Sequence, residues 1–192
     1  TSGSTGASPL SVATSSGGPG LASASSASAA SPLFSRTASY AVVLPSGDEA
    51  DVIHPSPTDL GSNPNYAFPV AVFLQGANVD KSHYGLVAQR IAAYGFVVVV
   101  PNHRNPIMRG LYSNVGRVTD GLAWARAEAT DPASPLVGAL DTTRLAALGH
   151  SFGGLAALNA LADRNVMPVQ SPGYQRPAEL ACAVVFGTTT AF

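Results

Sequence analysis

The chain has 192 residues, which is enough for one medium-sized domain and too few for two large ones. Apolar residues make up 46% of the sequence and charged residues 11%, a composition typical of a well-filled core under a weakly charged surface. The net charge is −1 and Lys81 is the only lysine, so no basic stripe is available for phosphates and the composition argues against nucleic-acid binding. No apolar run approaches the roughly 18 residues of a membrane-spanning helix, so no membrane span is expected.

The cysteine and histidine content argues against a metal centre. A single cysteine, Cys182, excludes an internal disulfide and a cysteine metal cluster, and its position in an apolar run predicts a buried, inert thiol. The histidines show no metal-ligand spacing; they are His54, His83, His103 and His150. No metal and no cofactor are therefore expected.

The N-terminal segment differs sharply from the rest. Residues 1–35 consist almost entirely of Ser, Ala, Gly, Thr and Pro, and the first charged residue is Arg36. Such a segment has little apolar surface to bury, so residues 1–38 are expected to be disordered and residues 39–192 to form the folded domain. Three interpretations of the first 35 residues stay open: a flexible linker, the tail of a larger protein, or part of a transit peptide directing the protein to a plastid or another organelle.

The first elements of the domain are predicted to be strands. Residues 40–44 and 50–54 are short strands on either side of a tight turn, which predicts an antiparallel pair with His54 at the surface or at an edge. Residues 68–74 are apolar on both faces, as a strand buried between two helix layers should be. They end in a short turn at residues 75–78.

The middle of the chain alternates helix and strand. Apolar residues at helical spacing predict a helix over 84–94 that stops at Gly95, followed by a central parallel strand over 96–100. Residues 101–112 are expected to form a loop. A second helix is predicted from an N-cap at Ser113 to about residue 129. Its inward face is Val115, Val118, Leu122 and Ala125.

The last third of the chain repeats this alternation. A strand over 145–148 is followed by a helix that reaches about residue 163, and a buried strand over 180–186 follows. The inward residues of that helix are expected to be Leu155, Leu158 and Ala162. The pattern predicts an α/β fold with a mainly parallel, doubly wound sheet, helices on both faces and antiparallel first strands. The segments after residues 74, 100, 148 and 186 should then meet at the edge where such sheets bind ligands.

The best-defined motif is G-x-S-x-G over residues 149–153, between a strand and a helix. A serine at the apex of such a turn forms a nucleophile elbow, and Cβ atoms at Gly149 and Gly153 would collide with the closely packed backbone. Strain at the apex holds the Ser151 Oγ away from the backbone, beside the first free N–H groups of the helix. The alternative is an ordinary strand-to-helix turn with Ser151 as a helix cap.

Three segments carry a resemblance to a known family. They are Phe-Leu-Gln-Gly-Ala at residues 73–77, Tyr-Gly-Phe-Val-Val-Val-Val-Pro at 94–101 and Gly-His-Ser-Phe-Gly-Gly at 149–154. Residues 40–192 resemble the N-terminal part of an α/β-hydrolase, through its sixth strand. The similar branch holds chlorophyllases, platelet-activating-factor acetylhydrolases, cutinase-like polyester hydrolases and dienelactone hydrolases.

The resemblance implies a set of catalytic residues. In that family a serine attacks an acyl carbon, a histidine takes its proton and an acid orients the histidine. Ser151 then matches the nucleophile, and the backbone N–H groups of Phe152 and Ala77 match the oxyanion hole. The loop after the third strand usually begins His-Gly, whereas here it begins Gln75-Gly76. Because a backbone donor does not depend on its side chain, Ala77 remains the expected second donor.

The triad cannot be completed from this sequence. The family order is serine, acid, histidine, and no histidine follows Ser151. The later carboxylates, Asp163 and Glu179, are expected near the opposite edge of the sheet. We therefore expect the acid and base beyond the present C-terminus. The fragment by itself should be inactive, because loss of the base lowers the rate by a factor on the order of 10⁶.

The other histidines have different expected roles. His83 and His103 lie on strand-end loops and could line the pocket, although both precede the serine. His150 is expected to pack and to form hydrogen bonds beside the nucleophile rather than to act as the base.

The sequence predicts a carboxylic ester hydrolase that forms an acyl-enzyme at Ser151. The alternatives are a non-catalytic binding domain that kept the elbow and an acyltransferase that uses the same serine. The expected partner is a small-molecule ester. Apolar residues at the pocket edge favour a hydrophobic one, unless they are buried under the loop; these are Ile107, Met108, Leu111 and Tyr112.

Overall fold

The computed structural model describes residues 30–56 and 67–189, and one compact unit comprises Ser31–Phe192. Most of the segment expected to be disordered, residues 1–29, lies outside the described residues. Folded structure starts before residue 39. The Phe34 side chain is buried edge-on against Phe68, with ring centroids 5.5 Å apart. An aromatic ring supplies the apolar area that the small residues before it lack.

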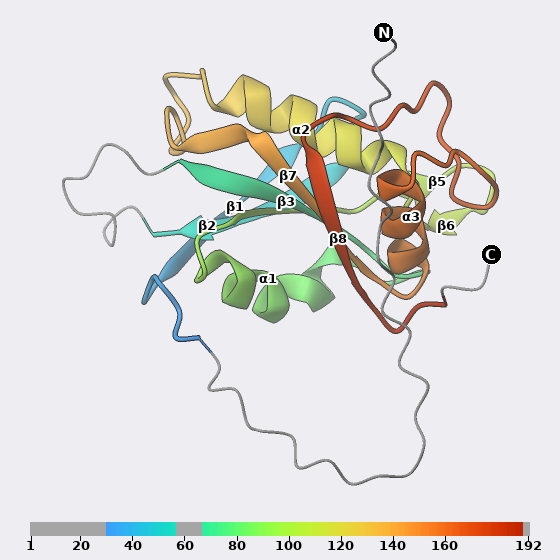
Figure 1. Ribbon diagram of the computed structural model, residues 1–192, viewed down its shortest axis with the longest axis horizontal. Helices are drawn as coiled ribbons and strands as arrows, with labels where there is room; N and C mark the ends of the chain where they lie inside the picture. The colour runs from blue at the N-terminus through green and yellow to red at the C-terminus, as the bar shows by residue number, and fades with distance from the viewer. Residues whose placement is uncertain (1–29, 57–66, 190–192) are drawn as a thin grey trace, which may run out of the picture. The chain divides into compact units, whose positions relative to one another are not determined.

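Six strands form one sheet in the order β1-β2-β4-β3-β7-β8 (Figure 1). The β1–β2 and β2–β4 pairs are antiparallel, whereas β4, β3, β7 and β8 run parallel. The strands are β1 (Thr37–Val43), β2 (Glu49–Pro55), β3 (Phe68–Leu74), β4 (Val97–Pro101), β7 (Leu140–His150) and β8 (Leu180–Phe186). The predicted α/β fold, with a mainly parallel sheet and antiparallel first strands, is confirmed.

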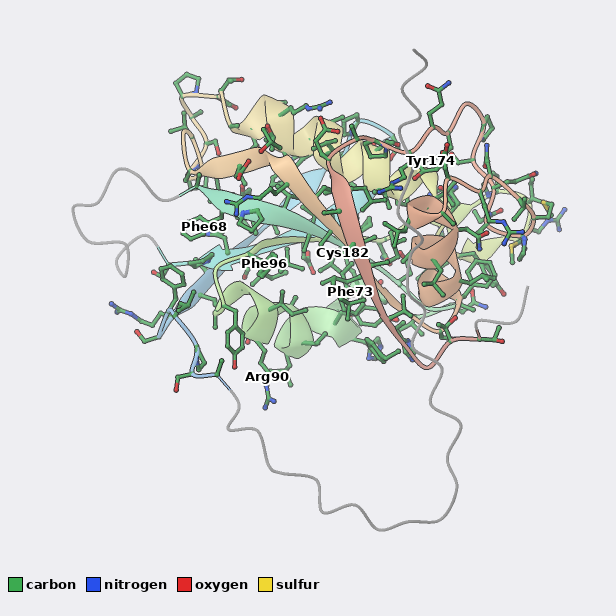
Figure 2. All side chains as sticks on the ribbon, in the orientation of Figure 1. Phe68, Phe73, Arg90, Phe96, Tyr174 and Cys182 are labelled. Atoms are coloured by element: carbon green, nitrogen blue, oxygen red, sulfur yellow. The ribbon has the colours of Figure 1, made fainter. Side chains whose placement is uncertain are left out.

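Helices cover both faces of the sheet, as a doubly wound fold requires. The helix α1 (Gly85–Ala92), preceded by the 3-10 turn η2 (Lys81–Tyr84), lies on one face, and α2 (Gly116–Glu128) and α3 (Phe152–Leu161) lie on the other (Figure 1). Alternate residues of β3 point to opposite layers: Val72 packs beneath α2, and Phe73 packs against α1. Figure 2 shows Phe73 on the α1 side and Arg90 on the outer surface of that helix.

The last strand is more exposed than the sequence predicts. Cys182, Val184 and Phe186 are exposed, so the expectation of a buried Cys182 thiol is wrong. The reason is that β8 is the edge strand among the described residues, and α1 packs on β2 and β4 instead. An apolar groove of about 340 Å³ remains on this face. It is lined by Ala71, Ile91, Tyr94, Phe96, Ala146, Leu148, Cys182 and Val184.

Two predictions for the middle of the chain are corrected. The expected loop over 101–112 contains a small hairpin, β5 (Arg104–Asn105) and β6 (Gly110–Leu111). Ser113 is not the cap of α2, because the helix begins later and the side-chain oxygen of Asn114 accepts from the Gly116 N–H at 3.0 Å.

His54 is buried rather than at the surface or an edge, with 3% of its side chain exposed. It lies on β2, an inner strand between β1 and β4, and the Tyr40 ring packs edge-on against it at 5.8 Å. Burial lowers the pKa of His54 from its ordinary value, with partial compensation from the Pro55 carbonyl, which lies 2.8 Å from Nδ1. The antiparallel register places His54 near the start of β4, away from the carboxyl end of that strand.

Candidate active site

The segments after β3, β7 and β8 line an open cavity of about 330 Å³ at the carboxyl end of the parallel strands. The sheet register brings these strand ends together, since Leu74 lies opposite Gly149 and His150 lies opposite Phe186. The cavity is lined by Ala77, Ser151, Phe152, Leu155, Gly187, Thr188 and Thr189. The residues that the sequence assigns to a nucleophile and an oxyanion hole thus line one cavity. The segment after β4 is not part of this lining.

Ser151 has a strained backbone. Its φ is 52° and its ψ is −118°, outside the regions that residues with a side chain usually adopt. The Ser151 N–H donates to the Phe186 carbonyl at 3.0 Å, which ties the turn to the end of β8. The side chain makes no capping hydrogen bond to α3. The interpretation of Ser151 as an ordinary helix cap therefore lacks its defining contact.

The two glycines of the turn sit where backbones approach closely. A Cβ atom at Gly149 would lie 2.4 Å from the carbonyl oxygen of Gly153. A Cβ atom at Gly153 would lie 2.0 Å from the carbonyl oxygen of Leu74, at the end of β3. Both distances are far below van der Waals contact, so any side chain would displace backbone. The turn and the end of β3 are consequently packed directly on each other.

Two residues of the cavity lining, Ala77 and Phe152, have backbone N–H groups without an acceptor among the described residues. Phe152 is the first residue of α3, so its N–H has no partner inside the helix. Within residues 30–56 and 67–189, no hydrogen bond uses the N–H of Phe152 or of Ala77. The N–H of Gly76, in contrast, donates to the Tyr84 hydroxyl at 2.8 Å. Of the Gly76 and Ala77 N–H groups, only that of Ala77 is left without an acceptor in the described part of the chain.

Gln75 stands where the family usually has histidine, and its side chain is fully buried. Its amide fits between β4 and the residues before α2. With the nitrogen toward the Pro101 carbonyl at 2.6 Å and the Ser113 hydroxyl at 3.1 Å, the oxygen accepts from the His103 N–H at 3.0 Å. This amide anchors the loop that carries Ala77. Ser113, which the sequence suggested as a helix cap, is part of this anchor.

His103 does not line the cavity. Its Nδ1 lies 2.9 Å from an Asp48 carboxylate oxygen, and its Nε2 lies 3.0 Å from the Asn114 amide nitrogen. Both ring nitrogens are thus engaged in a buried network that joins the β1–β2 turn to the start of α2. The Asp48 contact could not be predicted from the sequence, because the two residues are 55 positions apart.

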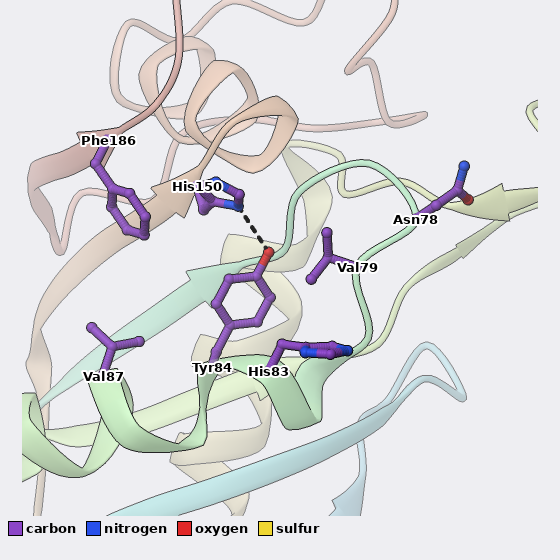
Figure 3. Close-up of a pocket in the computed structure, with 7 residues that line it drawn as sticks. All are labelled: Asn78, Val79, His83, Tyr84, Val87, His150 and Phe186. Carbon is purple, nitrogen blue, oxygen red and sulfur yellow. Dashed lines mark hydrogen bonds between the residues drawn. The ribbon is translucent and has the colours of Figure 1, made fainter.

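The remaining two histidines line a second cavity of about 470 Å³ beside the first (Figure 3). The cavity is lined by Asn78, Val79, His83, Tyr84, Val87, His150 and Phe186. The His150 ring packs against Phe186, with centroids 4.9 Å apart, and its Nδ1 lies 3.1 Å from the Tyr84 hydroxyl. This agrees with the packing and hydrogen-bonding role expected for His150. In the described part of the chain, no histidine forms a hydrogen bond with the Ser151 hydroxyl.

The carboxylates that follow the serine are engaged elsewhere. Asp163 accepts from the backbone N–H of Arg176 at 2.8 Å, and Glu179 forms an ion pair with Arg126. The Glu179 carbonyl accepts from the Leu145 N–H, which places Glu179 beside the middle of β7, away from the end of that strand at His150. Neither carboxylate lines the cavity.

The apolar residues of the β5–β6 region contribute less than expected. Ile107 is exposed, whereas the Tyr112 ring packs edge-on against Phe152 at 5.3 Å. The Tyr112 hydroxyl also accepts from the Asn78 side chain at 3.0 Å. Tyr112 therefore supports the wall of the site, while Ile107 points to solvent.

Residues 49–169, more than half of the chain, match the model of the chlorophyllase family. The chain belongs to the chlorophyllase family. The match extends from β2 past α3 and includes Ala77 and the turn at Ser151. The resemblance to this branch of the α/β-hydrolases is thereby confirmed.

This chlorophyllase-family chain is also similar to a fungal protein named "Probable 1-alkyl-2-acetylglycerophosphocholine esterase", from Arthroderma benhamiae. The two are 29% identical over 110 residues, which cover 50% of this chain and 28% of the fungal protein. The chain thus spans little more than a quarter of the length of the curated relative that it matches.

Neither a membrane-spanning helix nor a cluster of metal-ligating side chains is found among the described residues. No helix within the described ranges has the length and apolar character needed to cross a membrane. Among those same residues, no group of three or more histidine, cysteine or carboxylate side chains is arranged to hold a metal ion.

Proposed function

We propose that this chain carries the nucleophile of a serine hydrolase that cleaves carboxylic esters. The observation that supports the proposal most is the shared cavity. The strained Ser151 lines it together with Ala77 and Phe152, whose N–H groups have no acceptor among the described residues. An ester carbonyl bound there would meet the serine Oγ at carbon and two donors at oxygen, the arrangement that stabilises a tetrahedral intermediate.

In the proposed reaction, the Ser151 Oγ bonds to the acyl carbon and its proton passes to a histidine. The bond between the acyl carbon and the alcohol oxygen then breaks, and the alcohol leaves with that proton. Water attacks the acyl-enzyme in the second half and releases the acid. No described histidine contacts the serine hydroxyl. We therefore propose that the base and its orienting acid come from sequence outside these 192 residues.

We infer that the ester is hydrophobic. The cavity of Figure 3 adjoins the first one, because Asn78, His150 and Phe186 directly neighbour residues of the first lining in sequence. Its walls include Val79 and Val87. An ester whose carbonyl carbon lies at the serine could thus place a small group in the first cavity and an apolar group in the cavity of Figure 3. The substrate printed in the fungal relative's name joins an acetyl group to an alkyl glycerophosphocholine.

A fluorophosphonate probe tests the proposal. It should label the full-length protein, and Ser151→Ala should abolish labelling and lower kcat on an aryl ester by a factor on the order of 10⁶. Ser82→Ala is the matched control, because Ser82 is exposed in η2 and lies outside both cavities. Labelling and turnover should be unchanged in this control.

The second candidate is a non-catalytic binding domain. It is favoured by one observation, the lack of a described histidine in contact with the serine hydroxyl. A wild-type full-length protein that resists the probe, yet binds a hydrophobic ester with micromolar affinity, would support this alternative and contradict the hydrolase.

A further inference from the structure

The two proposed oxyanion donors lie on separate loops, and their relative position is not set by the sheet alone. The β3–β7 ladder ends with Leu74 opposite Gly149. Ala77 lies three residues beyond one end of this ladder and Phe152 three residues beyond the other. Because no ladder hydrogen bonds join the chains past that point, the spacing of the two N–H groups depends on the packing of Gly153 on Leu74 and on a further contact between the loops.

Tyr84 makes that contact. Its hydroxyl accepts from the Gly76 N–H at 2.8 Å and lies 3.1 Å from His150 Nδ1 (Figure 3). Gly76 directly precedes Ala77, and His150 directly precedes Ser151. A single hydroxyl thus bridges the loop after β3 and the turn after β7. The bridge is tight, since a Cβ at Gly76 would lie 2.9 Å from His150 Nδ1.

The surroundings of Tyr84 hold its hydroxyl in place. Only 5% of the side chain is exposed, and its ring packs on Phe73 with centroids 4.7 Å apart. Burial raises the pKa of Tyr84 from 10.0, with partial compensation by the Gly76 N–H, so the hydroxyl keeps its proton. The Gly76 N–H can only donate, so the hydroxyl proton is left free for donation to His150. A hydroxyl that donates to His150 Nδ1 requires the ring proton on Nε2, which is the arrangement that the bridge predicts.

We propose that Tyr84 is a positioning residue that sets the spacing between the Ala77 and Phe152 donors through Gly76 and His150. This rests on the proposed function, because the spacing matters only if the two N–H groups bind an oxyanion. Tyr84 and His150 also line the cavity proposed for the apolar group, but their hydrogen-bonded bridge acts on the two donors and not on that group. Loss of the bridge should therefore weaken stabilisation of the transition state and leave ground-state binding nearly unchanged.

The variant Tyr84→Phe tests this in the full-length protein, because it removes only the hydroxyl and keeps the ring on Phe73. We expect kcat on an aryl ester to fall about tenfold, less than the factor of 10² to 10³ for complete loss of a donor, with KM within about twofold of wild type. In ¹⁵N NMR spectra, the wild type should show His150 protonated at Nε2, and the variant should shift the Nδ1 resonance.

The matched control is Tyr40→Phe. The Tyr40 hydroxyl donates to Glu128 at 2.6 Å, so this variant also loses one hydroxyl hydrogen bond, but far from the cavity. It should keep the wild-type kcat and His150 resonances. An equal loss of kcat in both variants would show a general stability effect and overturn the role of Tyr84.

A double-mutant cycle tests whether Tyr84 acts through His150. His150→Gln combined with Tyr84→Phe should lower kcat no further than the stronger of the two single variants, because both break the same bridge. Independent, additive losses would overturn the bridge. A wild-type kcat in Tyr84→Phe, with Ser151 still labelled by the probe, overturns only the role of Tyr84. An unreactive wild-type Ser151 overturns the proposed function as well.

Discussion

Asp48 connects three parts of the fold through one carboxylate. It lies in the β1–β2 turn, accepts from His103 Nδ1 at 2.9 Å and also pairs with the Arg117 guanidinium. Burial raises the pKa of Asp48, but the hydrogen bonds and charges of His103 and Arg117 outweigh it, so the pKa is lowered from 3.8. The carboxylate therefore stabilises the fold in its ionised form. This network supports the two segments between which the Gln75 amide lies, the residues after β4 and the start of α2.

The sign of the resulting pH dependence follows from this lowered pKa. The contribution of Asp48 is complete above its unfolded-state pKa of about 3.9 and is lost as the pH falls through the folded-state pKa. Asp48→Asn should lower the free energy of unfolding at pH 7 by about 3 kcal/mol, because it leaves the buried Arg117 charge without its main partner. At pH 2.5 the difference from wild type should shrink.

Urea unfolding at both pH values measures this difference. Glu49→Gln is the control, since the neighbouring Glu49 is exposed and its neutralisation should change stability little at either pH. A loss for Asp48→Asn that is equal at pH 7 and pH 2.5 would contradict the role of ionised Asp48.

At the scale of elements, α2 and α3 differ in how well their buried faces could be predicted. The predicted inward residues of α2 are buried, because its apolar side chains recur at helical spacing. In α3 the prediction holds only for Leu155, which is partly buried and packs against the core, whereas Leu158 is only partly buried and Ala162 is exposed. The buried face consists of small residues, mainly Gly153, Gly154, Ala156, Ala157 and Ala160. The close approach of α3 to the sheet requires small side chains. Hydrophobic periodicity follows the large apolar residues and therefore does not identify a buried face made of Gly and Ala.

A pair of substitutions in α3 tests this assignment of faces. Ala157 is fully buried, so Ala157→Leu should lower the free energy of unfolding by about 1–3 kcal/mol through overpacking. Leu158 is partly buried, so Leu158→Ala should cost less than about 1 kcal/mol. Chemical denaturation of both variants checks the order. A larger loss for Leu158→Ala would mean that α3 presents its leucine face to the sheet.

In the whole molecule, what the sequence could predict was local or periodic. Alternating strands and helices predicted the sheet, and one five-residue pattern located the turn at Ser151. The contacts that organise the site join distant positions: Tyr84 and His150 are 66 residues apart, and Gln75 and Ser113 are 38 apart. No spacing rule connects such pairs, because their proximity depends on the completed sheet. The bridge and the anchor of the donor loop could therefore not be read from the sequence.

The exposed face of β8 predicts how the 192-residue chain behaves in solution. Val184 is 60% exposed and borders the apolar groove beside α1, and exposed apolar patches promote association. Val184→Thr should reduce concentration-dependent self-association of this chain in sedimentation and light-scattering measurements. Val43→Thr is the matched control, because Val43 is 67% exposed on β1 and lies outside the groove. An equal effect of both variants would contradict a role for the groove.

The buried amide of Gln75 has a consequence for how reaction rates should vary with acidity. A histidine at this position would change its hydrogen bonding on protonation near neutral pH. The Gln75 amide does not titrate, so its bonds to Pro101, Ser113 and His103 persist from mildly acid to alkaline solution. The Ala77 donor is therefore held by an anchor that is indifferent to proton concentration. A titration seen in acylation kinetics would then arise from groups other than the Gln75 anchor.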